Sequence, residues 1–166
     1  MLFTSGIEWK KVYSLTHTSN ELFKNLKDAK NKNASNETAD LFSILDELEQ
    51  YRSCSGDFHF KICYPELAGN FSFPCNEWTQ SSNPVSNSIV RDFKPINITF
   101  ESQTKDFNGL GMNEWGKEDN LIEDFPFLKN NRSFSVGTIN DKDGKIIGPG
   151  SYLVERVELF VNTGKI

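Results

Sequence analysis

The stretch from Cys63 to Pro84 constrains the fold of this chain more than any other part of its sequence. It holds two of the three cysteines, one of the three tryptophans and three of the six prolines. Proline fixes φ and lacks an amide donor, so we expect the stretch to form a loop and not a helix or a central strand. Such a loop needs an anchor, and a disulfide between Cys63 and Cys75 is the obvious one.

The cysteine count leaves a second possibility open. A Cys63–Cys75 disulfide would close a loop of eleven intervening residues and contribute about 2–3 kcal/mol. Cys54 lies in a predicted turn over 53–57 and would be free or paired with another chain. The alternative is that all three cysteines are buried, reduced thiols.

Length and charge narrow the class of protein. A chain of 166 residues predicts one domain, residues 1–166. Its 14 phenylalanines favour strands. A net charge of −5 with no Lys/Arg cluster argues against nucleic acid as a partner. No apolar run approaches the ~20 residues of a membrane span.

Five glycosylation sequons indicate the compartment in which the protein is found. They begin at Asn33, Asn36, Asn70, Asn97 and Asn131. The N-terminus has no signal-peptide features, which leaves a processed or excised domain open. Together with the cysteines, the sequons predict a secreted, extracellular glycoprotein. We expect glycans on some of the five, and not on Asn33 and Asn36 together, because these two are so close.

Hydrophobic periodicity predicts about six strands and two early helices. The main strands are expected over 7–15, 58–64, 95–100, 134–139 and 154–161, and the helices over 21–30 and 37–51.

Individual side chains follow from these patterns. Trp9 is expected on one face with Tyr13 and Leu15. In 95–100 the alternation directs Ile96 to the core and leaves Asn97 exposed.

The helix predicted over 37–51 is the strongest in the sequence. Asn36 is its expected N-cap. Its apolar side chains recur at three- and four-residue steps. They are Leu41, Ile44, Leu45 and Leu48.

These elements predict an α+β, mainly β fold. The helices cluster in the N-terminal third and do not alternate with strands, which argues against a doubly wound parallel sheet. We therefore expect an antiparallel β-sandwich-like domain with two helices packed on one side or end.

Several short motifs resemble a known family. They are Cys63-Tyr64-Pro65-Glu66, the run 75–84, Gly109-Leu110-Gly111, Ile147-Gly148-Pro149-Gly150 and the run 157–161. As a set they resemble an extracellular domain of secreted, multidomain invertebrate adhesion and matrix proteins, which also carry fibrinogen-like and EGF-like modules. The resemblance implies a matrix or adhesion setting, a Cys63–Cys75 bridge and no catalytic residue.

Candidate binding residues lie mostly in predicted loops. Trp78 or Trp115 would form the platform of a carbohydrate site, and the carboxylates flanking Trp115 would suit a glycosidase if they converged. Solvated loop charge is the alternative. Asp141 and Asp143 form part of a calcium-loop pattern without its first Asp or its final Glu, and a hairpin turn is the alternative. Calcium is the only cofactor that the sequence leaves open.

The two histidines indicate no catalytic or zinc site. His17 and His59 have no cysteine or histidine at ligand spacing. His59 is expected on the polar face of its strand as a surface histidine.

The leading hypothesis is a non-enzymatic extracellular interaction module, such as a matrix, adhesion or filament subunit, that binds other extracellular proteins or glycans. A carbohydrate-binding lectin-like module is the alternative, and a glycosidase-like enzyme the third hypothesis. In the last predicted strand, Phe160 falls on the face opposite Val157, Leu159 and Val161. Either a helix covers Phe160 or it anchors a homotypic contact.

Overall fold

The computed structural model describes residues 7–16, 23–69, 71–100, 107–112, 125, 134–136 and 152–164. In chain order the elements are β1 (Trp9–Thr16), α1 (Leu26–Lys30), β2 (Leu41–Ser43), the 3₁₀ helix η1 (Leu45–Tyr51), β3 (Phe58–Cys63), the 3₁₀ turn η2 (Pro65–Leu67), β4 (Cys75–Gln80), β5 (Lys94–Ile98), β6 (Phe134–Val136), β7 (Tyr152–Val154) and β8 (Arg156–Asn162).

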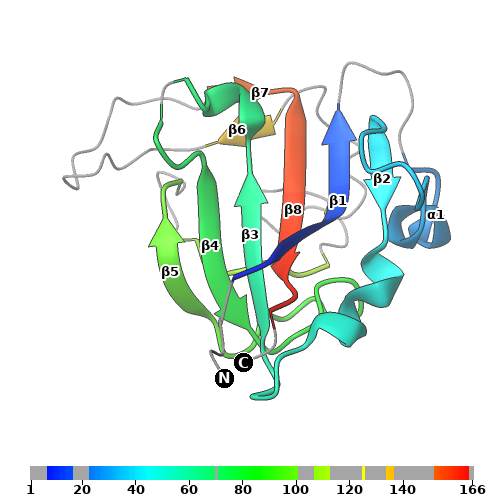
Figure 1. Ribbon diagram of the computed structural model, residues 1–166, viewed down its shortest axis with the longest axis vertical. Helices are drawn as coiled ribbons and strands as arrows, with labels where there is room; N and C mark the ends of the chain where they lie inside the picture. Colours follow the sequence, from blue (N-terminus) through cyan, green and yellow to red (C-terminus); the bar gives the residue numbers. More distant parts are fainter. Residues whose placement is uncertain are drawn as a thin grey trace, which may run out of the picture.

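A six-stranded antiparallel sheet forms the body of the molecule (Figure 1). Its strand order is β2-β1-β8-β3-β4-β5, and β6 and β7 pair separately. The last strand, β8, therefore lies in the middle of the sheet between the first strand and β3. The α+β, mainly β class is confirmed. The sheet is open, and a sandwich of two facing sheets is not confirmed.

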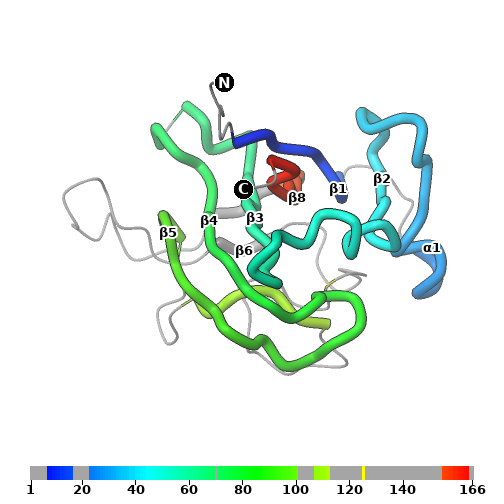
Figure 2. The backbone as a smooth tube through the Cα atoms, turned by 60° about the horizontal axis from the view of Figure 1, so that its bottom comes forward, coloured from blue at the N-terminus to red at the C-terminus, as the bar shows by residue number. Residues whose placement is uncertain are grey.

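One face of the sheet carries the hydrophobic core. In β3 and β8 every second residue is buried, as the period-two pattern predicts. Phe58, Phe60 and Trp78 are among the largest fully buried side chains on this face. Figure 2 shows η1 and the segments 81–93 and 107–112 gathered on one side of the strands. They cover the core where a sandwich would have a second sheet.

Strand β1 changes face part-way along its length. Its pairing with β8 shifts register between Lys11 and Tyr13, so that Lys11 is opposite Phe160 while Tyr13 is opposite Leu159. Such a bulge turns the side chains that follow it to the other side. The prediction that Trp9 shares a face with Tyr13 is therefore wrong.

The predicted helix over 37–51 is wrong. Residues Leu41–Ser43 form β2, which pairs with β1, and only Leu45–Tyr51 is helical, as a 3₁₀ helix. All three β2 residues are buried, and a strand buried on both faces shows an apolar run that a helix pattern also fits. Asn36 is not a helix cap; its Oδ1 accepts from the Thr38 N–H and hydroxyl.

Two further expectations change at element boundaries. The first helix begins at Leu26 and its N-cap is Asn25, whose Oδ1 accepts from Asp28 N at 2.9 Å. The predicted boundary at 21 lies outside the described residues. In β5, Ile96 is 53% exposed, because β5 is an edge strand of the sheet. The expectation that Ile96 points into the core is wrong.

The run that was expected to be a loop contains an internal strand. β4 pairs with β3 on one side and β5 on the other. Pro74 and Pro84 lie just outside β4, so neither removes one of its ladder hydrogen bonds. A proline does not fit in a central strand, but the residues next to it in the chain can.

The disulfide joins two neighbouring strands. Cys63 ends β3 and Cys75 begins β4, directly opposite each other, with their Sγ atoms bonded. Cys54 is exposed in the turn before β3 and is not in a disulfide. The bridge therefore fixes the register of β3 on β4 as well as the turn between them.

Replacing Cys63 and Cys75 together by alanine should lower the free energy of unfolding by about 3 kcal/mol, because the unfolded chain loses its closed loop. Denaturant unfolding of the oxidised protein measures this loss. Cys54→Ser is the matched control and should leave stability unchanged. An unchanged unfolding midpoint in the double variant would show that the bridge adds nothing to the sheet.

Candidate functional site

Asn76 uses its side chain to hold the segment that follows β5. Its Nδ2 donates to Phe100 O at 2.9 Å. Its Oδ1 accepts from Thr99 N at 2.9 Å and from Phe100 N at 2.8 Å. The amide is fully buried, and it satisfies three backbone groups of Thr99 and Phe100.

Gln80 uses its side-chain amide to hold the segment 107–112. Its Oε1 accepts from the Trp78 indole N–H at 2.7 Å and from Leu110 N at 3.0 Å. Its Nε2 donates to Leu110 O at 2.9 Å and to Ser82 O at 2.8 Å. Trp78 is fully buried and its only N–H is used here, so it is excluded as a sugar platform.

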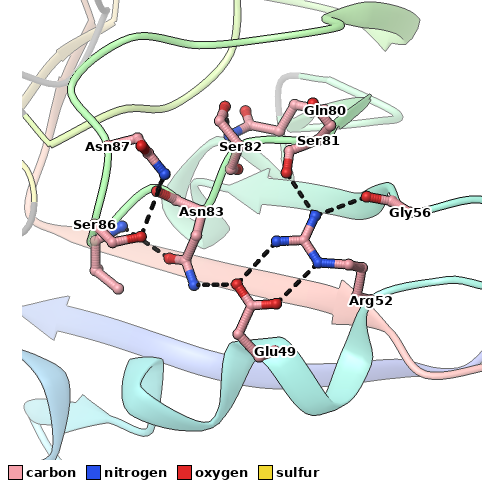
Figure 3. A network of polar contacts seen from close by, with 10 residues as sticks. Glu49, Arg52, Gly56, Gln80, Ser81, Ser82, Asn83, Ser86 and Asn87 are labelled. Carbon is pink, nitrogen blue, oxygen red and sulfur yellow. Dashed lines mark hydrogen bonds and ion pairs between the residues drawn. The ribbon is translucent and has the colours of Figure 1, made fainter.

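A surface network ties η1 to the segment after β4 (Figure 3). Arg52 donates to both carboxylate oxygens of Glu49, from Nε at 2.9 Å and from Nη2 at 2.8 Å. Its Nη1 reaches the carbonyls of Gly56 and Ser81 at 2.7 and 2.6 Å. Asn83 Nδ2 donates to the same carboxylate at 3.1 Å. The motif 75–84 is therefore a structural framework.

This network makes the stability depend on pH. The hydrogen bond from Arg52, and then that from Asn83, lowers the pKa of Glu49 from its ordinary value of 4.5. A depressed carboxyl pKa adds stability above pH 4.5 that is lost as the pH falls through the folded value.

Glu49→Gln should remove this pH dependence. Wild type should lose more stability than Glu49→Gln between pH 5 and pH 3, by less than about 1 kcal/mol, because the Glu49 side chain is 60% exposed. Urea unfolding at the two pH values measures the difference. Parallel losses in the two proteins would contradict the role of the Glu49 charge.

The face of the sheet opposite the core carries a layer of aromatic and charged side chains, which we call the outer face. The register places five of them in one row across β1, β8, β3, β4 and β5. The row is Lys11, Phe160, Lys61, Glu77 and Asn97. Trp9, His59, Glu158 and Asn162 lie beside it.

Lys61 lies between two aromatic rings at the centre of the outer face. Its Nζ is 4.5 Å from the centroid of Trp9 and 5.0 Å from that of Phe160. Burial lowers the pKa of Lys61, and the nearby Glu77 carboxylate opposes that shift. In the described part of the chain, its ammonium has no hydrogen-bond or ion-pair acceptor. Its three N–H groups are left for water or a bound partner.

His59 is held in one orientation by two neighbours. Asn162 Oδ1 accepts from the backbone N–H of Glu8 and of Gly164, at 3.1 and 2.9 Å. That leaves Asn162 Nδ2 to donate to His59 Nδ1, at 3.1 Å. His59 Nε2 then carries the proton and donates to Glu77 Oε2 at 2.7 Å. The ring also contacts Trp9 edge-on, with centroids 4.8 Å apart.

An open groove of about 800 Å³ lies at the β1 and β8 end of the outer face. Its aromatic side chains are Trp9 and Phe160, both half-buried. Polar residues make up the rest of the lining, namely Glu8, Lys10, Lys11, Glu37, Glu158 and Thr163. Lys11 and Arg156 both pair with the Glu158 carboxylate.

The predicted glycosylation sites lie in different settings. Asn33, Asn36 and Asn97 are exposed. Asn33 has φ of 51° and donates to Leu41 O at 2.8 Å. The other predicted site residues lie outside the described residues: Asn70, Asn131, Trp115, Asp141 and Asp143, together with His17.

The sequence pattern missed most of the outer face. The alternation in 58–64 placed His59 and Lys61 on a polar face, and that holds. It gave no sign that Trp9 and Phe160 would enclose Lys61, because these contacts join strands about 50 and 100 residues away in the chain. The sequence sign of the change of face was Lys11, which interrupts the apolar positions of 7–15, because the bulge itself is visible only in the pairing with β8.

Comparisons with protein-family models, curated proteins and solved structures found no match. Within the described ranges, no three His, Cys, Asp or Glu side chains gather as metal ligands. Of the helices in those ranges, none has the length and apolar character needed to cross a bilayer.

Asn97 should carry a glycan when the chain is expressed through a eukaryotic secretory pathway, because it is exposed on an edge strand. Asn97→Gln should then reduce the intact mass by one glycan. Asn87→Gln, an exposed asparagine outside any sequon, is the control. Equal glycan masses for wild type and Asn97→Gln would contradict the prediction.

Proposed function

We propose that this chain is a non-enzymatic extracellular interaction module that contacts its partner through the outer face. The observation that carries the proposal is the Lys61 ammonium held between the Trp9 and Phe160 rings. Aromatic side chains, Trp and Phe among them, are enriched at protein interfaces, and Trp is among the residues that most often dominate the binding energy. Here they stand on strands of a rigid sheet, which lowers the entropy lost on binding.

Three further observations support an extracellular setting. The chain has a disulfide between adjacent strands, which persists in oxidising compartments. Three of its sequons are exposed in the described residues. The resemblance to adhesion and matrix proteins points to the same environment. The partner is then another extracellular protein, a glycan or a second copy of the chain.

The position of Phe160 favours a contact surface over a core role. Phe160 is half-buried, and in the described residues the ammonium groups of Lys61 and Lys11 lie over its ring. The helical element against β8 is η2, whose Glu66 accepts from the backbone N–H groups of Glu155 and Arg156 at the start of the strand. α1 packs against β2 and η1, and η1 packs against β1. A hydrophobic ring set among lysines can exchange its solvent contacts for a partner without unfolding the sheet.

Phe160→Ser and Lys61→Glu test the outer face. We expect wild type to self-associate at high concentration in sedimentation velocity and both variants to remain monomeric. The loss of unfolding free energy should stay below ~2 kcal/mol, because the ring is already half-exposed. Ile96→Ser, an exposed apolar side chain on the edge strand β5, is the matched control and should behave like wild type.

Two outcomes would contradict the proposal. If wild type and variants are all monomeric, and Phe160→Ser loses ~2 kcal/mol or more, Phe160 is a core residue and not a contact residue. Turnover of an oligosaccharide substrate by the wild-type chain would contradict the non-enzymatic assignment.

A further inference from the structure

We propose that the groove at the β1 and β8 end of the outer face binds a neutral carbohydrate, with Trp9 as its main stacking side chain. This inference rests on the proposed function and names the ligand class. Trp9 differs from the two sugar platforms that the sequence suggests, since Trp78 is buried and Trp115 lies outside the described residues.

The groove carries charges of both signs, with one more carboxylate than ammonium group. Its lining holds three carboxylates and two ammonium groups. Lys11 and Glu158 pair with each other, which leaves Glu8, Glu37 and Lys10 for a ligand. Among the described residues Glu8 and Glu37 have no ion-pair partner. An anionic ligand would meet these two carboxylates, and a cationic ligand would meet Lys10 beside them. An apolar ligand would desolvate charged groups without replacing their hydrogen bonds.

A neutral polyhydroxyl ligand fits this set of donors and acceptors. Its hydroxyls donate to the carboxylates of Glu8 and Glu37 and accept from Lys10. Hydrogen bonds to charged groups are the stronger class, so they give such a ligand its orientation. Thr163 adds a hydroxyl that donates to Glu8 O at 3.3 Å and still has acceptor capacity.

Trp9 is prepared for stacking by its own neighbours. Lys61 Nζ lies over its ring, and His59 contacts it edge-on. These contacts fix the indole before a ligand arrives, which reduces the entropy cost of binding. The C–H groups on one side of a pyranose ring pack on an aromatic surface, and its hydroxyls point outward to polar groups. Phe160 supplies a second aromatic contact in the same groove.

The charged lining of the groove favours a small polar ligand over a protein. The hollow of about 800 Å³ is open to solvent, so a ligand would lie along it and would not be enclosed. A stable protein interface covers roughly 800 Å² on each partner, and its centre is depleted of charge. The carboxylates and lysines that line this groove have the opposite composition.

The test is a titration of the full chain with neutral oligosaccharides selected on a glycan array, followed by isothermal calorimetry. Wild type should bind, and the dissociation constant should change less than twofold between 50 and 500 mM NaCl. Trp9→Ala should weaken binding at least tenfold, while Trp9→Phe should weaken it less.

Charge-removing variants keep the test valid if Trp9→Ala fails to fold. Glu37→Gln and Lys10→Gln, both at exposed positions, should each weaken binding about three- to tenfold and leave the unfolding midpoint unchanged. Glu155→Gln and Lys94→Gln are the matched controls, exposed and outside the groove. They should bind as wild type does.

Three results would overturn the inference. They are the absence of any neutral glycan bound on the array, binding confined to acidic glycans, and unchanged affinity in Trp9→Phe, Glu37→Gln and Lys10→Gln. If one of these occurs while Lys61→Glu still abolishes self-association, the inference fails and the proposed function stands. If Lys61→Glu changes nothing and the groove variants lose binding, the inference stands and self-association is not how the module works.

Discussion

The pairing of β8 with both β1 and β3 is the constraint on which the rest of the structure depends. Without β8 the sheet would separate into β2-β1 and β3-β4-β5. The contact joins residues about 150 positions apart, such as Trp9 and Asn162. Closing a loop of that length costs conformational entropy, which the pairing of β8 with both of its neighbours helps to offset.

Strand β8 also couples the core to the outer face. Val157, Leu159 and Val161 are fully buried, while Glu158 and Phe160 belong to the outer face. Because successive side chains of a strand alternate, a one-residue slip of β8 would exchange the two sets. The register that completes the core thus also places Phe160 beside Lys61. No separate interaction is needed to assemble the candidate site.

Two buried amides replace the secondary structure that the covering segments lack. The segments around Phe100 and Leu110 are irregular, yet their backbone groups are buried. Asn76 and Gln80 each offer both donors and acceptors, so one side chain from β4 satisfies several of these groups. This explains why open loops can cover a sheet face where a second sheet was expected.

The sequence predicts what depends on local periodicity and misses what depends on distant pairing. Strands β3 and β8 follow from strict alternation, and the disulfide from the cysteines that flank a proline-rich run. The helix prediction for 41–51 is wrong because the apolar spacing there suits a helix, while pairing with β1 makes the first part of the segment a strand. The sequence predicts only part of the outer face. The alternation places His59 and Lys61 there, but their aromatic neighbours come from other strands.

The composition of the outer face is itself an argument about function. A methionine or leucine at position 61 would pack between Trp9 and Phe160 without desolvating a charge. Lysine there carries a desolvation cost, which appears as its lowered pKa. The rings offset part of that cost through their quadrupoles, but among the described residues no acceptor takes the ammonium N–H groups. Lys61 therefore stabilises the fold less than an apolar side chain would. Its ammonium is preorganised and open to solvent, which suits recognition of a partner better than stability.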